Sequence, residues 1–215
     1  MFLRLTGLLA LLISTAACNA QTPAAAPVEG EDYFLIENPS PPESGDKIEV
    51  IEVFSYACPH CADFQPFIDG WKKTQPADVD FQYIPAAFGN TWDDFARAFY
   101  TAQVMGILDK THHELFKALH KDRRPLRGTA AIAAFYGDYG VDPKVFEGTM
   151  NSFAVNAKIG RSKQQVPRWQ VDGTPTLVVD GKYRVVAGKK GFDGMLKTLD
   201  AVIVKARADR AAAKK

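Results

Sequence analysis

The chain has 215 residues, 47% of them hydrophobic, and a formal net charge of +1. This is enough apolar material for a buried core, which excludes disorder over most of the length. The balanced charge excludes an extended basic surface, so no nucleic-acid partner is expected. The one basic cluster, KARADRAAAKK, closes the chain, and we expect a solvated helix end with a frayed basic tail over residues 210–215.

Residues 1–20 have the layout of an export signal. MFLRLTGLLALLISTAACNA begins with one basic residue, continues through an apolar run and ends among small residues. The apolar run is too short to span a bilayer comfortably. Two processing outcomes are open. Cleavage could follow Ala20, or it could precede Cys18 with lipid attached to that thiol, because TAAC resembles a bacterial lipobox.

The next segments predict a tether and then a strand. Residues 21–46 are rich in Pro, Ala and acidic residues, which indicates a tether, with YFLI (33–36) docking as an edge strand. KIEVIEVFSY (47–56) is dense in β-branched and aromatic residues and is apolar on both faces. That pattern is typical of a buried central strand.

A helix is predicted to begin at or just after Cys58. Apolar residues recur there at helical spacing, at Phe64, Phe67, Ile68 and Trp71. Pro59 suits the first helical position, where a missing N–H costs nothing, and Pro66 is expected to kink the helix. VDFQYIP (79–85) predicts a second strand, so residues 47–88 form a strand–helix–strand unit, the first half of a sheet domain.

Residues 89–162 predict a helical insertion. We expect Thr91, Thr129 and Asp142 to cap helices within it, and a further helix to run from about Ser152. The strand pattern then returns.

Residues 163–209 supply the second half of the sheet domain. TPTLVV (174–179) and KYRVV (182–186) predict a hairpin turning at Asp180-Gly181, followed by a closing helix with one apolar face. The fold class is therefore α/β, with a central mixed β-sheet interrupted by an inserted α-helical domain.

Without Cys18 the mature chain keeps one closely spaced pair, Cys58 and Cys61. Cys58 stands at a helix N-terminus, where free N–H groups and the helix dipole favour an anion and lower the pKa of a thiol. Cys61, one turn further along, is expected to be more buried. Cys58 is therefore predicted to be the attacking and leaving sulfur, and Cys61 the resolving one.

Two further residues are candidates for tuning this pair. His60, between the cysteines, can donate a hydrogen bond or place positive charge beside the thiolate. Glu52 interrupts an apolar strand, so we expect a carboxyl that is at least partly buried, with a raised pKa and a role in moving a proton. The alternative interpretations are an ordinary surface histidine and a glutamate that reaches solvent at the strand end.

VFSYACPHC followed by VDGTPTLVVDGKY resembles the DsbA family of periplasmic thiol-disulfide oxidoreductases, over about residues 45 to 205. The resemblance implies a thioredoxin fold with a helical domain inserted. It also implies that Pro175 forms a cis peptide bond beside the cysteine pair and that Thr174 offers its backbone to an incoming peptide. Pro59 and His60 complete the Cys-Pro-His-Cys motif.

The implied activity is oxidation of reduced, unfolded exported proteins in the periplasm by a monomer without a cofactor. Re-oxidation would come from a quinone-linked membrane oxidase of the DsbB type. The chain departs from the family pattern in two places. Thr174 stands where oxidases frequently have Val and is more familiar in the related isomerases, and VDFQYIP offers no basic residue to accompany Glu52.

Three other functions compete with oxidation. A zinc site would join the cysteine pair to two of His112, His113 and His120, but the pair supplies only half a tetrahedral set and Cys-Pro-His-Cys at a helix N-terminus suits redox chemistry better, so no metal is predicted. The three histidines lie on a charged helical segment and are expected on the solvated surface. A non-catalytic binding module would use the pair as a structural disulfide, but that disulfide would close too short a loop to stabilise the chain much. A disulfide isomerase of this fold would need a dimerisation domain, for which the residues before Lys47 are too few.

Overall fold

The computed structural model describes residues 26–214, so the export signal and Cys18 lie outside the described residues. Their processing stays a prediction. Within residues 26–214, no helix has the length and apolar content that a membrane crossing requires.

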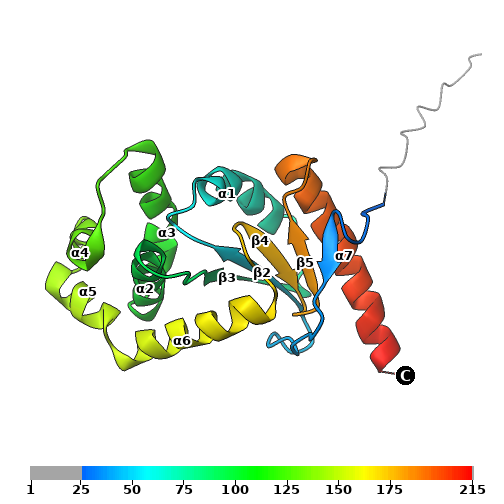
Figure 1. Ribbon diagram of the computed structural model, residues 1–215. Helices are drawn as coiled ribbons and strands as arrows, with labels where there is room; N and C mark the ends of the chain where they lie inside the picture. The colour runs from blue at the N-terminus through cyan, green and yellow to red at the C-terminus, as the bar shows by residue number, and fades with distance from the viewer. Residues whose placement is uncertain (1–25, 215) are drawn as a thin grey trace, which may run out of the picture.

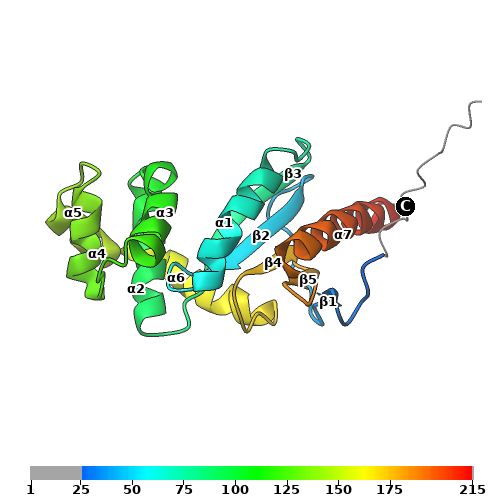
Figure 2. The same ribbon diagram turned by 90° about the horizontal axis from the view of Figure 1, so that it is seen from above.

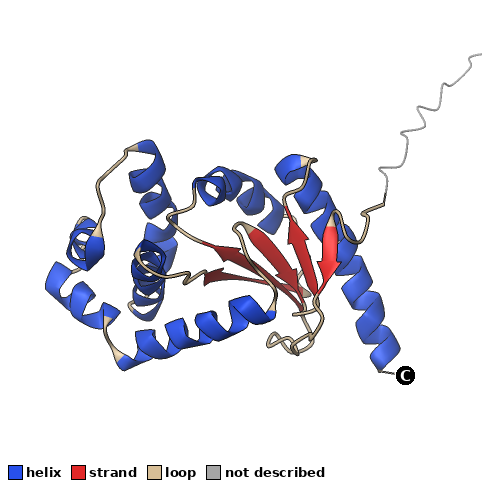
Figure 3. Cartoon of the chain, viewed as in Figure 1, coloured by secondary structure: helices blue, strands red, loops and turns tan. Residues whose placement is uncertain are grey.

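A five-stranded mixed sheet forms the centre of the described chain (Figure 3). Its strands are β1 (Tyr33–Leu35), β2 (Ile48–Phe54), β3 (Val79–Pro85), β4 (Thr176–Val179) and β5 (Tyr183–Val186), in the order β1-β5-β4-β2-β3. The β2–β3 pair is parallel and the other pairs are antiparallel. The edge strand expected in YFLI, the buried central strand and the mixed sheet are all confirmed.

Helices surround the sheet and form a separate group at one end of the molecule (Figures 1 and 2). They are α1 (Pro59–Lys72), α2 (Thr91–Val104), α3 (Leu108–Phe116), α4 (Gly128–Gly137), α5 (Pro143–Met150), α6 (Phe153–Arg168) and α7 (Gly191–Ala213). A π-helical turn, η1 (Lys117–Lys121), continues α3. Helices α2 to α5 lie together on the left of both views, and α7 lies on the right.

Strand β2 is buried along its whole length because both faces of the sheet are covered. Alternate side chains of a strand point to opposite faces. Ile48 and Val50 pack with apolar residues of α1 and α7, whereas Ile51 and Val53 pack with the end of α6. A third apolar cluster joins the inserted helices to Phe54 and to both cysteines. The cysteine pair thus lies where the sheet meets the insertion.

The predicted helix caps are partly wrong. Asn90 is the N-cap of α2 and Thr91 is its first helical residue, with no capping bond from either side chain. Helix α4 starts at Gly128, and the Thr129 hydroxyl donates to Glu147 instead, at 2.8 Å. In both places a tertiary or loop contact decides the helix start in place of the local pattern.

The third predicted cap is confirmed, since Asp142 accepts hydrogen bonds from the backbone N–H groups of Lys144 and Val145 at the start of α5. The helix expected from about Ser152 is also present as α6, and the Ser152 side chain accepts a hydrogen bond from the Val155 N–H at its start.

Two helices run across boundaries that we placed by composition. Helix α6 is continuous from the inserted group to the sheet, so no loop separates residues 162 and 163. Helix α7 continues to Ala213 through the segment expected to fray. It is held there because Arg210 donates two hydrogen bonds to the buried Asp180 carboxylate, each 2.7 Å long.

Candidate active site

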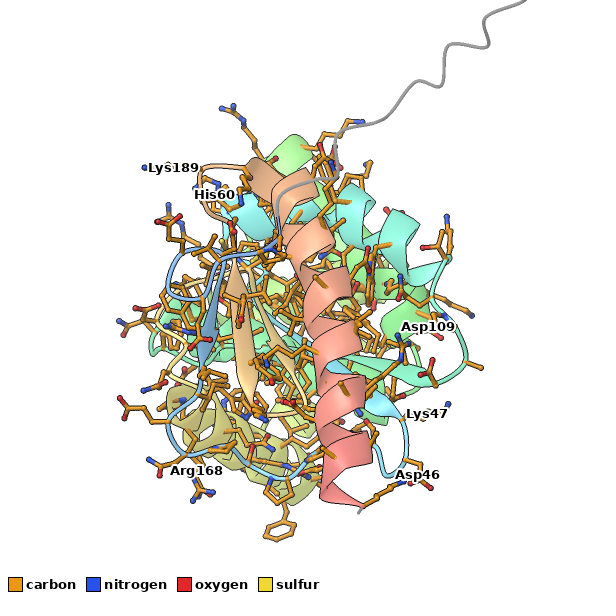
Figure 4. The ribbon with its side chains drawn as sticks, turned by 90° about the vertical axis from the view of Figure 1, so that its right-hand side faces the viewer. Asp46, Lys47, His60, Asp109, Arg168 and Lys189 are labelled. Carbon is orange, nitrogen blue, oxygen red and sulfur yellow. The ribbon has the colours of Figure 1, made fainter. Side chains whose placement is uncertain are left out.

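The cysteine pair sits at the N-terminus of α1, immediately after the central strand. Cys58 is the N-cap residue, Pro59 takes the first helical position as predicted, and the Cys58 N–H donates to the Ser55 carbonyl at 3.1 Å. Figure 4 shows His60, which lies between the cysteines, beside Lys189 at one end of the sheet, with Lys47 at the other end. Only 7% of Cys58 and none of Cys61 is exposed.

Cys58 is an acidic thiol. Its pKa is lowered to about 5, first by a hydrogen bond from the Cys61 thiol and then, in smaller measure, by Thr174 and by the backbone N–H groups of Cys61 and His60. Together these influences outweigh partial burial, which raises the pKa. At neutral pH the Cys58 sulfur is therefore a thiolate, the nucleophilic form.

Cys61 behaves in the opposite way. Burial, and secondly its hydrogen bond to Cys58, raise the pKa of the Cys61 thiol far above its usual range. The pair thus holds one proton, on Cys61, and one negative charge, on Cys58. This difference between the pKa values of the two thiols suits a reaction in which the two sulfurs act in sequence.

The His60 side chain is exposed, as is Pro59. The backbone N–H of His60 is one of the smaller influences that lower the pKa of the Cys58 thiol. The imidazole lines the groove described below. Its predicted tuning role stays a proposal.

Glu52 is completely buried, so the expectation of a buried carboxyl holds. Neither carboxyl oxygen has a hydrogen-bond partner among the described residues. Burial raises the pKa of Glu52 well above its usual value, and the positive charge of Lys72 only partly opposes this. The carboxyl is close enough to raise the pKa of Cys61 when it is charged. A proton exchange between Glu52 and that thiol stays a prediction.

A basic residue does accompany Glu52, although it comes from α1 and not from β3. Lys72 donates to the Tyr83 hydroxyl at 2.9 Å, and Tyr83 lies opposite Glu52 in the parallel β2–β3 pair. Gln65 stands 3.5 Å from the same hydroxyl. Sequence reasoning missed these three residues. The spacing of Gln65 and Lys72 from Cys61, four and eleven residues along one helix, is the pattern that would have placed them on its inner side.

The Thr174–Pro175 peptide bond is cis, as the resemblance implies. The Cys58 thiol lies 3.3 Å from the Thr174 carbonyl oxygen, which brings the start of β4 against the helix N-terminus. A groove of about 520 Å³ opens beside them, lined in part by His60, Phe34 and Arg184. The sequence did not suggest the last two, because they reach the groove from β1 and β5 through sheet pairing.

The expectation for the histidines of the insertion is wrong for His112. This side chain is 4% exposed, and its Nδ1 lies 2.8 Å from the Tyr56 hydroxyl. His120 is half-buried, with Nε2 2.7 Å from the Tyr56 carbonyl oxygen. Of these three histidines, His113 is the exposed one. Over residues 26–214, no three side chains from Cys, His, Asp and Glu gather as metal ligands would.

A thioredoxin-type sheet, a helical insertion and two unequal thiols at a helix N-terminus beside a cis proline define a class, the thioredoxin-like dithiol proteins. The model of the DSBA-like thioredoxin domain family matches residues 49–200. A thiol:disulfide interchange protein DsbA from Pseudomonas aeruginosa is 40% identical over 187 residues, which cover 86% of this chain and 87% of that protein. The chain therefore belongs to the DsbA family.

Other relatives agree. A thiol:disulfide interchange protein DsbA from Burkholderia cepacia is 36% identical over 93% of this chain and 95% of its own length. Among solved structures, the oxidoreductase DsbA from Xylella fastidiosa superposes with a TM-score of 0.80 at 38% identity, over 86% of this chain and all of that chain. The match extends through the inserted helices as well as the sheet, which confirms the predicted fold class.

Proposed function

We propose that this chain is a thiol:disulfide oxidoreductase that introduces disulfide bonds into exported proteins by donating a Cys58–Cys61 disulfide. Its relatives bear the name thiol:disulfide interchange protein. The observation that carries the proposal is the difference between the two thiols. A thiolate with a pKa of about 5 leaves readily and stabilises the reduced pair, so the disulfide readily oxidises other thiols.

The reaction has two exchange steps. A substrate thiolate attacks the Cys58 sulfur, a new S–S bond forms, and Cys61 leaves and takes up a proton, for which the neutral, buried Glu52 carboxyl is a source. A second substrate thiolate then attacks the substrate sulfur of this mixed disulfide and releases Cys58 as a thiolate. The substrate loses two electrons and the pair gains them. In reverse, Glu52 accepts the proton of Cys61 as Cys61 resolves the mixed disulfide.

Substrate binding is assigned to Thr174 and Pro175, with the groove beside them. The loop before β4 lies against the Cys58 sulfur, so a peptide bonded to that sulfur runs past the Thr174 backbone. An extended peptide gains affinity from main-chain hydrogen bonds and tolerates many side chains. That suits an enzyme whose substrates are unfolded and varied.

The working site is the periplasm, reached through the export signal of residues 1–20, with Cys18 lipidation as the alternative route to a tethered form. The protein acts as a monomer without nucleic acid or cofactor. Because the reduced pair is the favoured state, an external oxidant must restore the disulfide, and a quinone-linked membrane oxidase of the DsbB type fits that need. Isomerase activity, which Thr174 raises as an alternative, would instead require the reduced form to persist.

Two single substitutions test the proposal with a reduced dithiol peptide as substrate. Cys58→Ser should abolish peptide oxidation, because the attacked sulfur is gone. Cys61→Ser is instead given the disulfide form of the same peptide. The Cys58 thiolate should attack that disulfide and release one peptide thiol, and the mixed disulfide between Cys58 and the peptide should be detectable by intact mass after an acid quench, because no resolving thiol remains on the protein. Retained oxidation by C58S, or a mixed disulfide on Cys61, would overturn the assignment.

A further inference from the structure

Tyr56, two residues before Cys58, is held at both of its ends by one helix of the insertion. Its hydroxyl lies 2.8 Å from His112 Nδ1, and its carbonyl oxygen lies 2.7 Å from His120 Nε2. A carbonyl can only accept, so Nε2 of His120 carries the proton and donates it. Tyr56 itself is fully buried, with Phe116 packed 4.9 Å away between ring centroids.

The backbone of the helix explains how both histidines reach the same residue. In a continuous α-helix, positions eight residues apart differ by about 80° around the axis. The turn η1, over residues 117–121, is π-helical, and its wider turn advances fewer degrees per residue. This brings His120 round toward the side that His112 occupies. Such turns occur frequently at functional sites.

The contact between the Tyr56 hydroxyl and His112 joins two neutral groups. Burial lowers the pKa of His112 to about 3 and raises that of the Tyr56 hydroxyl, so neither is charged at neutral pH. The segment that they hold leads directly to the active-site sulfur. The Ser55 hydroxyl oxygen accepts a hydrogen bond from the Ala57 N–H, and the Ser55 carbonyl accepts one from the Cys58 N–H, both at 3.1 Å.

We propose that His112 and His120 are positioning residues of the active site, which clamp Tyr56 and thereby fix the Cys58 sulfur relative to its hydrogen-bond donors. The inserted helices thus act on the reacting sulfur through a defined pair of side chains, in addition to packing against the sheet. This inference rests on the proposed role of Cys58 as the reacting thiolate.

The test compares amides that differ in reach. Gln at position 120 places its amide nitrogen near the position of histidine Nε2, whereas Asn is too short to bond the Tyr56 carbonyl. In the reduced protein, H120N should raise the pKa of Cys58 by about half a unit or more, because its hydrogen bonds from Cys61 and from the helix backbone loosen. H120Q should retain the wild-type value. His113→Ala, on the same helix but exposed, is the matched control.

The readouts are thiolate absorbance against pH, the rate of dithiol peptide oxidation, and the thermal midpoint. H120N should slow oxidation by about threefold while H120Q and H113A do not. A purely structural role would lower the midpoint without moving the Cys58 pKa, and that result overturns the proposal. If H120N does not fold, Tyr56→Phe replaces it, because this substitution removes only the hydroxyl facing His112. Y56F should also raise the pKa of Cys58, and a lowered thermal midpoint with an unchanged Cys58 pKa would overturn the proposal.

The outcome separates this inference from the proposed function. An ordinary Cys58 pKa in the wild-type protein would contradict the role of that thiol. A low wild-type value that stays equal in H120N, H120Q, H113A and Y56F would contradict the clamp alone.

Discussion

Glu52 combines complete burial with two carboxyl oxygens that have no hydrogen-bond partner within residues 26–214. Leaving a charge in such a place is costly, so the group holds its proton and its pKa rises. The nearby Lys72 forms an ion pair with Asp69 at 2.7 Å, and its side chain is 29% exposed. Its positive charge is therefore too solvated, and too occupied by Asp69, to cancel the cost of burying a charged Glu52. A carboxyl kept neutral next to a buried thiol can give up its proton, and once ionised can take it back, without contact with water.

Replacing Glu52 by Gln should affect stability and rate in different ways. A folded-state pKa above the unfolded value means that the stabilising contribution of Glu52 is fully present below about pH 4.3 and is lost as pH rises toward the folded-state pKa. E52Q lacks this loss, so its unfolding free energy should match wild type at pH 4 and exceed it at pH 8. Denaturant titrations at the two pH values measure the difference.

The same substitution should slow peptide oxidation by about tenfold or more, because no proton donor remains beside Cys61. The control is Glu49→Gln. Glu49 is also buried on β2, at 4% exposure, but three residues away and hence on the opposite face. It should leave the rate unchanged. Equal rates for E52Q and wild type would remove Glu52 from the proton path.

Among the elements, helix starts show where local pattern suffices. Asp142 followed by Pro143 specifies a cap by itself, because the carboxylate accepts two N–H bonds and proline fits the first turn. The start of α2 is set otherwise. Asn90 adopts a φ of 49°, and the Gly89 N–H donates to Asp93 at 2.9 Å, so the chain enters the helix one residue earlier than Thr91 predicts.

Asp142→Ala should lower the free energy of unfolding by about 1 kcal/mol, the usual loss for a removed N-cap. Thr91→Ala, at a position that resembles a cap in the sequence, is the control. Thr91 is exposed and caps nothing, so its change should stay within about 0.5 kcal/mol. The urea midpoints of both variants measure these changes. A loss of unfolding free energy in T91A larger than about 0.5 kcal/mol would contradict the assigned helix start.

At the scale of the whole molecule, the sequence predicted the sheet, the insertion and the cysteine pair, because each depends on short-range patterns. The sequence did not predict residues that meet only through contacts between different elements. Lys72 meets Tyr83 from a different element, and Phe34 reaches the groove through the β1–β5 pairing. His112 was misjudged because charged neighbours suggested a solvated face, whereas Tyr56 and surrounding aromatic rings enclose it.

The acidity of Cys58 depends on the whole molecule, because its surroundings come from α1, from the Thr174 loop and from the strand–helix junction that the insertion packs against. A folded-state pKa below the unfolded value means that the thiolate stabilises the reduced protein above about pH 8.5. That contribution is lost as pH falls through the folded-state pKa. The reduced form should thus lose stability relative to C58S between about pH 8.5 and pH 5.

The most direct test of the central claim is titration of Cys58 in the reduced protein, followed by thiolate absorbance, with C58S as the blank. We predict a single transition with a pKa of about 5, absent in C58S and retained in C61S with a raised midpoint, because the strongest donor to the thiolate is then altered. A wild-type transition near the ordinary thiol value of about 8.5 would contradict the assignment of Cys58 as the leaving sulfur of an oxidising pair.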